Sequence, residues 1–240
     1  NLGLSIEPRV IKEVIEDINL DLDLKKLHFS KNAEILIAGC GTGQHAITTA
    51  SKYKNAKIFA LDLSFNSLAY AKRKAKELNC NNIKFIQGDL LDLRKLDKKF
   101  DIIESVGVLH HMADPLLGWG CLTDCLKKDA LMLIGLYSEK ARENIANIRE
   151  KINNLNIKTT KKNIINFRKD IFENNTTIRD SIKYSPDFYS TSGVRDLLFH
   201  VQEHRFTIKK IRSHMNKLRL IFLGFEDTYI LNQFKKKYNQ

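Results

Sequence analysis

Apolar residues follow two alternating patterns along the first half of the chain. Five short runs have the composition of strands in a buried sheet: 34–38, 57–63, 83–86, 100–105 and 130–137. Three stretches between them carry apolar residues at helical spacing: 44–53, 65–78 and 116–126. This alternation predicts an α/β fold with a doubly wound, mainly parallel sheet and helices on both faces. The fifth run is almost continuously apolar, so we expect both of its faces to be covered.

The remaining sequence predicts helices and one further strand. Pro8 and the apolar spacing after it predict an N-terminal helix within residues 7–19. The Lys- and Asn-rich stretch 139–175 predicts one or two helices inserted after the fifth strand. The apolar stretch 218–225 predicts a sixth strand at the edge of the sheet.

Composition and charge narrow the class of protein. The 240 residues, 43% of them hydrophobic, suffice for one large core, and no apolar run approaches the roughly eighteen residues of a membrane-spanning helix. We expect a cytoplasmic protein without a secretory signal, and the four cysteines show no disulfide framework. The formal charge is +12, but Lys outnumbers Arg by 29 to 11 and the lysines are dispersed, which argues against a nucleic-acid partner. The oligomeric state stays open, as does whether the chain, which begins at Asn1, is part of a longer protein.

Three glycines interrupt the pattern directly after the first apolar run. Gly39, Gly41 and Gly43 allow backbone conformations closed to other residues, and they let a ligand approach bare amides. The following helix directs its N-terminal amides at the same place. A strand, a glycine turn and a helix in this order open a nucleotide-binding unit, although glycine turns also end strands for purely geometric reasons.

Acidic residues stand at the ends of three of the other predicted strands. Asp62 follows the glycine turn by about twenty residues, the separation at which a carboxylate can accept both hydroxyls of a ribose. Asp89 and Glu104 end the next two strands. Ligands of doubly wound sheets bind outside the carboxyl ends of the strands, so we expect these side chains to meet at one edge.

The ordered set of motifs resembles the class I S-adenosylmethionine-dependent methyltransferases. The set is Ile-Leu-Ile-Ala-Gly-Cys-Gly-Thr-Gly, Ala-Leu-Asp-Leu-Ser, Gln-Gly-Asp-Leu, Phe-Asp-Ile-Ile-Glu and Gly-Val-Leu-His-His-Met, within 33–137. The resemblance implies transfer of a methyl group from S-adenosylmethionine by in-line displacement. It also implies four parts: an N-terminal helical segment (1–30), a cofactor-binding Rossmann-like core (31–138), an inserted substrate lid (139–206), and a C-terminal helix with an edge strand (207–240).

The resemblance assigns cofactor contacts residue by residue. It implies that the glycine turn faces the methionine moiety, that Asp62 binds the ribose with Leu63 against the adenine, and that Asp89 and the Leu90 amide read the adenine edge. The full set of expected cofactor residues is Gly39, Cys40, Gly41, Gly43, Gln44, Asp62, Leu63, Asp89, Leu90 and Glu104. Many members carry an acidic residue where this chain has Ile37, so the contact to the cofactor's amino group must come from elsewhere, from Glu104 or from backbone carbonyls.

Candidate residues for chemistry on the acceptor follow the fourth strand. His110 or His111 can remove a proton from an O or N acceptor, since the ordinary pKa of histidine is near neutrality. A structural or cofactor-shaping role is the alternative, and if the stretch is extended, only one of the two rings can face the cofactor. The expected acceptor contacts are Tyr137, Tyr189, Arg195 and His200. An Arg among aromatic residues indicates an anionic, partly apolar acceptor, which is either a small molecule, a peptide or an exposed side chain.

The spacing of His200, Glu203 and His204 matches the zinc-binding pattern His-x-x-Glu-His on a helix. A zinc site needs a third protein ligand, and the sequence offers none, so we predict no metal there. The other interpretations are a wall of the substrate pocket or polar residues on one face of a helix.

Three other functions compete with methyl transfer to a small molecule or side chain. A nicotinamide dehydrogenase is disfavoured because its motif, Gly-x-Gly-x-x-Gly, expects a glycine where this chain has Gln44. A catalytically silent methyltransferase-like binding module is disfavoured by the intact Asp62 and Asp89, and favoured by Ile37. An RNA methyltransferase is the third alternative.

Overall fold

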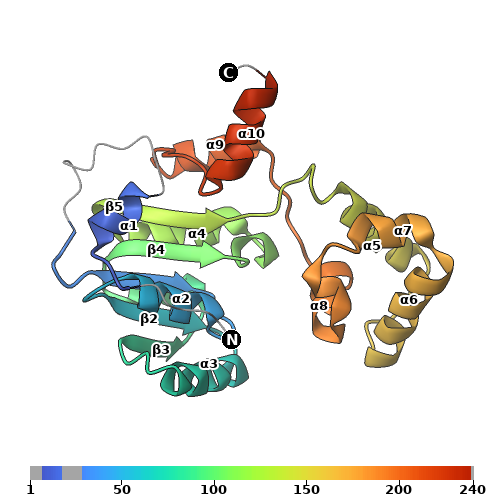
Figure 1. Ribbon diagram of the computed structural model, residues 1–240, viewed down its shortest axis with the longest axis horizontal. Coiled ribbons are helices and arrows are strands. Elements are labelled where there is room, and N and C mark those ends of the chain that lie inside the picture. Colours follow the sequence, from blue (N-terminus) through green and yellow to red (C-terminus); the bar gives the residue numbers. More distant parts are fainter. Residues whose placement is uncertain (1–6, 18–28, 239–240) are drawn as a thin grey trace. The chain divides into compact units, whose positions relative to one another are not determined.

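The computed structural model describes residues 7–17 and 29–238, which form two compact units (Figure 1). The first unit contains the described residues up to 109, together with 114–135 and those from 212 onward. The second contains 110–113 and 136–211. Within the described ranges, no helix has both the length and the apolar character needed to cross a membrane.

The first unit contains a five-stranded sheet in which all neighbouring strands are parallel. The strands are β1 Glu34–Ala38, β2 Lys57–Asp62, β3 Ile83–Gln87, β4 Phe100–Val106 and β5 Leu126–Gly135. Their spatial order is β3-β2-β1-β4-β5, so the order reverses between β1 and β4. Ligands of doubly wound sheets bind at such a reversal. The predicted fold class is confirmed.

The two faces of this sheet bury alternate residues of its strands. Ile35, Ile37 and Ile58 belong to a core cluster that also includes residues of α1 (Ile11–Glu16), α2 (Gln44–Lys52) and α3 (Phe65–Glu77). Leu36 and Phe59 are buried as well, and strand alternation directs them to the opposite face. Leu93 of η2 (Leu90–Leu96) and Leu122 of α4 (Pro115–Asp124) are further buried residues. Residues on both faces of the central strands are therefore buried.

Side-chain caps stabilise the predicted starts of α3 and α4. Ser64 Oγ accepts a hydrogen bond from the Ser67 amide at 3.2 Å at the start of α3. Asp114 Oδ1 accepts from the amides of Leu116 and Leu117, and Pro115 is the first residue of α4. These caps satisfy amides that have no partner inside the helix. Of the predicted N-terminal helix within 7–19, α1 forms inside the described residues, whereas 18 and 19 lie outside them.

Two predictions about the edge of the sheet are wrong. β5 begins at Leu126 rather than at 130, and its side chains are only partly buried in its apolar half, because β5 is the last strand in the order. The stretch 218–225 forms no strand; it connects α9 (Ile208–Lys217) to α10 (Thr228–Tyr238). Ile221 and Phe222 are 82% and 54% exposed, so this apolar stretch is not part of the sheet or of the core.

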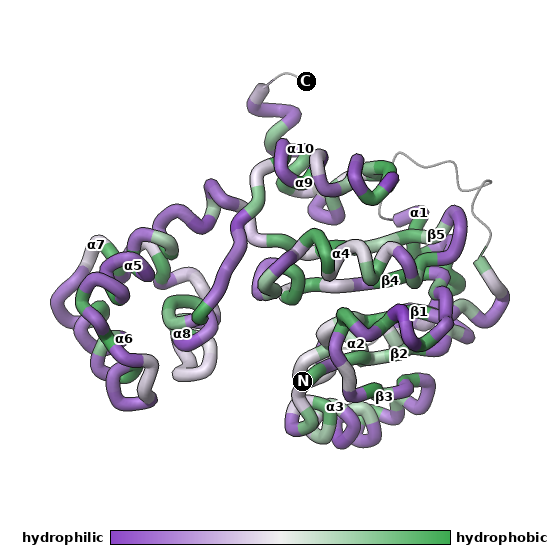
Figure 2. The backbone as a smooth tube through the Cα atoms, turned by 180° about the vertical axis from the view of Figure 1, so that it is seen from behind, coloured by the Kyte–Doolittle hydropathy of each residue, from purple (hydrophilic) through white to green (hydrophobic). Residues whose placement is uncertain are grey.

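The second unit is helical and has a core of its own. It contains α5 Glu143–Asn154, α6 Lys161–Asn174, α7 Thr176–Ile182, η4 Pro186–Tyr189 and α8 Thr191–Leu198. Each of the four α-helices contributes two or three Ile, Val or Leu residues to a common core that includes Phe188. Figure 2 shows the corresponding alternation of hydrophobic and hydrophilic residues along α5, α6 and α7. The predicted helices within 139–175 are confirmed.

Candidate active site

The glycine loop after β1 is fixed to the end of β2 by backbone hydrogen bonds. The amides of Gly39 and Cys40 both donate to the Leu61 carbonyl, at 2.8 and 2.9 Å. The Gly43 amide donates back to the Cys40 carbonyl at 2.9 Å, and α2 begins at the next residue. The loop is therefore a defined turn at the reversal of the sheet.

Two glycines of the loop serve different purposes. Gly43 has a φ of +87°, and a Cβ there would lie 2.5 Å from the Ala71 Cβ and 3.1 Å from the Ala71 Cα. Close packing of α3 therefore requires this glycine. Gly41 has a φ of +51°, and a Cβ there would meet no protein atom within 4 Å. Its backbone borders open space, which leaves room for a ligand to lie beside the loop.

Asp62 holds the loop and the start of α3 together. Its Oδ2 accepts from the Gly41 amide at 2.7 Å, and its Oδ1 accepts from the Ser64 amide at 2.9 Å. An ionised carboxylate offers about four acceptor positions, so two remain for a ligand. Leu63 beside it is 67% exposed, an apolar surface of the kind that a flat ring can cover.

The end of β3 presents a second carboxylate. Asp89 caps η2, and its Oδ1 accepts from the Leu91 amide at 2.9 Å. The Leu90 side chain is buried at 6% exposure, which fixes the backbone next to Asp89. The pairing of Asp62 with Gln87 in the β2–β3 ladder brings the two strand ends to the same edge.

Glu104 lies within β4, directly beside Ile37 in the β1–β4 ladder. The residue is buried at 7% exposure, and its Oε2 contacts two side chains of α2. The His45 Nε2 lies 2.6 Å away, and the Thr49 hydroxyl donates at 2.8 Å. Sequence reasoning missed His45 and Thr49. Their separation of four residues on one helix was the available signal, because such residues share a face.

The two remaining loop residues have simpler environments. Burial, and then the charge of Asp62, raise the pKa of the Cys40 thiol to about 12, so it is not a reactive thiolate at neutral pH. Gln44 is the first residue of α2 and is exposed.

These observations, together with the comparison with known families, identify the fold's relatives. A family model described as "Methyltransferase domain" matches residues 29–191, which is more than half of the chain. The chain belongs to this methyltransferase family. Membership identifies S-adenosylmethionine as the cofactor and disfavours the nicotinamide alternative.

Named relatives of this methyltransferase domain differ in what they modify. An uncharacterised protein of Synechococcus is 30% identical over 201 residues, which cover 80% of this chain and 48% of that protein. The (S)-coclaurine N-methyltransferase of Papaver somniferum is 27% identical over 115 residues, which cover 48% of this chain and 32% of that protein. The release factor glutamine methyltransferase of Flavobacterium psychrophilum is 41% identical over 80 residues, which cover 33% of this chain and 28% of that protein. One name refers to a small molecule and another to a protein, so the family does not fix the acceptor.

A solved structure shares the fold of this methyltransferase. PKMT2 from Rickettsia typhi in complex with AdoHcy superposes with a TM-score of 0.64 at 17% identity, over 86% of this chain and 44% of that one. The chain thus spans about half or less of the length of the relatives that it matches.

The predicted catalytic histidines of the methyltransferase belong to the second unit. His110 and His111 end a short turn of 3₁₀ helix, η3 (Leu109–His111), so the stretch is not extended. The His110 ring is buried at 1% exposure and stacks on Tyr137, with centroids 3.7 Å apart and planes at 27°. The His111 ring is half-buried and lies against His200, with centroids 3.9 Å apart. The structure therefore brings together four of the predicted residues.

The hydrogen bonds of His111 define its tautomer. Its Nδ1 lies 3.1 Å from the Gln202 carbonyl, and because a carbonyl only accepts, Nδ1 carries the proton. Burial, together with the positive charge of a protonated His200, lowers the pKa of His111 below its ordinary value, although the Gln202 carbonyl opposes this. At neutral pH the ring is neutral, and Nε2 is a proton acceptor.

Tyr189 and Arg195 have other surroundings. The Tyr189 hydroxyl donates to the Lys183 carbonyl at 2.6 Å, and its ring lies beside Phe172 and Phe188. Arg195 is exposed on α8, and its side chain makes no ion pair within the described residues. Neither contacts the rings of His111 or Tyr137 in the described part of the second unit.

The stretch His200–His204 is not helical, so the expectation of polar residues on a helix face is wrong. Glu203, buried at 4% side-chain exposure, forms ion pairs with Arg142 at 2.5 Å and with Arg149 at 2.9 Å. The Arg142 guanidinium also lies 3.8 Å from the centre of the Tyr137 ring. Sequence reasoning missed both arginines. Within the described residues, no group of three acidic, Cys or His side chains could hold a metal ion.

Proposed function

We propose that this chain is the catalytic domain of an S-adenosylmethionine-dependent methyltransferase that acts on a small molecule or on an exposed side chain. Family membership supports the reaction class. The observation that carries the proposal is the edge formed by the glycine loop, Asp62 and Asp89, where two strand ends present carboxylates beside the open space at Gly41.

The residues present fit the cofactor. Asp62 has acceptor positions left for two ribose hydroxyls, and the exposed Leu63 offers an apolar surface to the adenine. Asp89 and the Leu90 amide then accept from and donate to the edge of the base. The amides of the first turn of α2, including Gln44, face the carboxylate of the methionine moiety.

Glu104 supplies the carboxylate for the cofactor's ammonium group in place of the residue absent at Ile37. It lies on the neighbouring strand beside that position, and the contacts with His45 and Thr49 engage only its Oε2. The second oxygen, Oε1, is left for an ammonium ligand. A carboxylate held in this way gains a charge-assisted hydrogen bond, the strongest kind available here.

His111 acts as the base for an O or N acceptor. When bound, S-adenosylmethionine supplies a methyl group on a sulfonium sulfur, which leaves as a neutral thioether when the lone pair of the acceptor attacks. His111 Nε2 takes the proton that the acceptor loses, and Nδ1–H stays on the Gln202 carbonyl. Alignment of the two reactants is the larger contribution, worth about 7–11 kcal/mol. Tyr137 and His200 surround His111 and complete an aromatic wall.

Calorimetric titration with S-adenosylmethionine tests the cofactor site. Asp62→Ala should weaken binding by about 1–3 kcal/mol, because ribose hydroxyls lose their acceptor. Asp92→Ala removes an exposed carboxylate of η2 with an ion pair to Lys95, and it should leave the affinity unchanged. Equal affinity in the wild type and the Asp62 variant would remove the ribose assignment. Saturable binding without methyl transfer to any acceptor would instead identify a silent binding module.

A screen of cell metabolites and peptides for incorporation of labelled methyl groups tests the acceptor. We expect an anionic, partly apolar acceptor that is held by Arg195 and Tyr189, rather than a long nucleic acid. Arg195→Ala should then abolish acceptor binding and keep cofactor affinity, whereas Arg212→Ala, also an exposed arginine, should change neither. Full activity of the Arg195 variant would place the acceptor elsewhere, and preferential methylation of RNA would favour the nucleic-acid alternative.

A further inference from the structure

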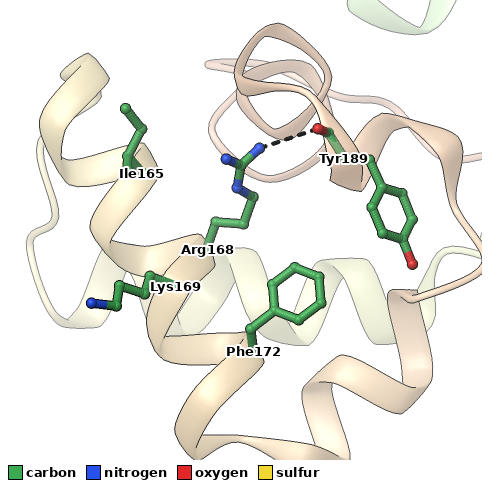
Figure 3. A pocket seen from close by; sticks show the side chains of 5 residues that line it. All are labelled: Ile165, Arg168, Lys169, Phe172 and Tyr189. Atoms are coloured by element: carbon green, nitrogen blue, oxygen red, sulfur yellow. Dashed lines mark hydrogen bonds between the residues drawn. The ribbon is translucent and has the colours of Figure 1, made fainter.

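A groove on the second unit lies between one face of α6 and the end of η4 (Figure 3). It is lined by Ile165, Arg168, Lys169, Phe172 and Tyr189 and has a volume of about 440 Å³. We call it the α6 groove. In Figure 3, Phe172 and Arg168 point toward the side of Tyr189, and Lys169 points away at the rim.

The groove uses a face of α6 that the core of the unit does not need. Ile164 and Ile171 are buried in that core at 0% and 1% exposure. Ile165 and Phe172 are 38% and 40% exposed, although they are large and apolar, and the 58% exposed Tyr189 faces them from η4. Large apolar side chains gathered on one surface, rather than scattered singly, are typical of interaction sites.

The walls of the groove are held in place before any ligand binds. The Phe172 ring stacks on the fully buried Phe188, with centroids 5.2 Å apart and planes at 26°. The Tyr189 hydroxyl donates to the Lys183 carbonyl at 2.6 Å. A ligand therefore does not have to order these rings, which favours affinity.

Arg168 gives the groove a charge. One guanidinium nitrogen, Nη1, donates to the Tyr189 carbonyl at 3.3 Å, and in the described residues the side chain has no carboxylate partner. The remaining N–H groups are suited to an ionised carboxylate. Within the described residues, Lys169 forms a long, exposed ion pair of 3.7 Å with Glu173. Residues 158–183 contain seven basic and three acidic side chains, so this region attracts acidic partners.

We propose that the α6 groove binds an acidic peptide segment, with an aromatic side chain against Phe172 and Tyr189 and a carboxylate on Arg168. A free small molecule is the weaker candidate, because these walls are 40% or more exposed and would leave much of it in water, whereas ligand sites usually bury most of their ligand. A peptide extends past the groove, so it does not have to be enclosed by these walls. Tyr189 is also an acceptor contact in the proposed function, but peptide binding is measured without cofactor or methyl acceptor, so its outcome is separate from that of methyl transfer.

Fluorescence anisotropy with the full chain and a labelled decapeptide of alternating Glu and Phe tests the proposal. We expect saturable binding that weakens with added salt, and at least a tenfold loss of affinity in Arg168→Gln. Lys162→Gln removes the same charge from the same helix outside the groove and should change the affinity less than twofold. A peptide of alternating Glu and Ala should bind at least tenfold more weakly than the Glu and Phe peptide.

A matched pair of variants at the exposed Ile165 separates electrostatics from folding. Ile165→Glu should abolish binding of the acidic peptide, whereas Ile165→Lys, which removes the same apolar side chain, should retain or strengthen it. Circular dichroism checks that both variants are folded, and if Ile165→Glu is not, the Arg168 and Lys162 pair decides. The proposal is overturned by absence of saturable binding, by equal effects of the Arg168 and Lys162 substitutions, or by tighter binding of a Lys and Phe peptide or of single-stranded RNA.

Discussion

Glu104 of β4 lies directly beside Ile37 of β1 in the parallel ladder at the reversal of the sheet. Side chains of paired residues in neighbouring strands emerge on the same face. A carboxylate on β4 therefore occupies nearly the place that a carboxylate at position 37 would have. His45 and Thr49 of α2 hold it there through its Oε2.

Glu104→Gln should weaken binding of S-adenosylmethionine by about 1.5–3 kcal/mol, the contribution of a hydrogen bond to a charged group. This loss corresponds to a tenfold or larger rise in Kd by calorimetry. Glu77→Gln, at the exposed end of α3, is the control and should leave the Kd unchanged. An unchanged Kd in the Glu104 variant would assign the ammonium contact to backbone carbonyls instead.

Substitutions at Gly41 and Gly43, the last two glycines of the loop, should have separate effects on stability and on cofactor binding. Gly43→Ala should lower the melting temperature strongly, because its Cβ would overlap Ala71 and its φ is +87°. Gly41→Ala meets no protein atom, so it should cost only about 1–2 kcal/mol for its left-handed backbone. It should nevertheless weaken cofactor binding, since its Cβ enters the space beside the loop amides. Thermal unfolding and calorimetry on both variants measure the two effects, and full cofactor affinity of Gly41→Ala would show that the ligand does not approach this residue.

The cofactor edge was predictable from sequence because its signals are local. A glycine turn between a strand and a helix, and a carboxylate at the end of the next strand, each depend on a few neighbouring residues. The spacing of His45 and Thr49 places both on one face of α2, but their partner was not predictable, because it depends on the register that puts Glu104 within reach of α2. Likewise, the apolar stretch 218–225 indicated burial but not a partner, and it lies outside the sheet.

In the second unit, the critical contacts join residues far apart in the sequence. Glu203 meets Arg142 and Arg149 across 61 and 54 positions. No periodicity or motif links such residues, so only the packing of α5 against the stretch after α8 reveals them. The pattern His-x-x-Glu-His suggested a helix, but the stretch is not helical. The pattern indicates zinc only when a helix presents both histidines on one face.

Glu203→Gln should lower the free energy of unfolding by about 3–5 kcal/mol at pH 7, because two largely buried arginines lose their counter-charge. Burial raises the pKa of Glu203, but the hydrogen bond and charge of Arg142 and the charge of Arg149 outweigh it and hold the pKa below 4.5. The stabilisation is therefore present above pH 4.5 and is lost as the pH falls through the lowered pKa. Melting temperatures of the two proteins should converge in acid.

The exposed pair Lys140–Glu143 provides the control for this measurement. Glu143→Gln changes the same chemical group, but the Lys140 side chain that pairs with it is 90% exposed. The melting temperature of this variant should therefore equal that of the wild type at every pH. Similar behaviour of the Glu143 and Glu203 variants would show that burial of the ion pair contributes no stability.

We expect no stoichiometric zinc in the purified protein. Glu203 is occupied by two arginines, and His200 and His204 do not lie on a helix. Elemental analysis of protein prepared without added metal measures this directly. About one zinc per chain that disappears in His200→Ala would contradict the prediction.

The pH dependence of methyl transfer should report the ionisation of His111. Burial and the charge of His200 lower the pKa of His111 below 6.5, so the neutral base prevails at pH 7 and is lost as the pH falls. The rate with an O or N acceptor should therefore rise with pH below 6.5, which is the ascending limb of the pH–rate profile, and then level off.

His200→Phe keeps a ring against His111 but removes the charge of His200, so the ascending limb should move to higher pH, while the plateau rate changes little. His111→Asn should remove the limb together with most of the rate. A limb that stays in place in His200→Phe, or that persists in His111→Asn, would assign the titration to another group and leave alignment of the two reactants as the source of catalysis.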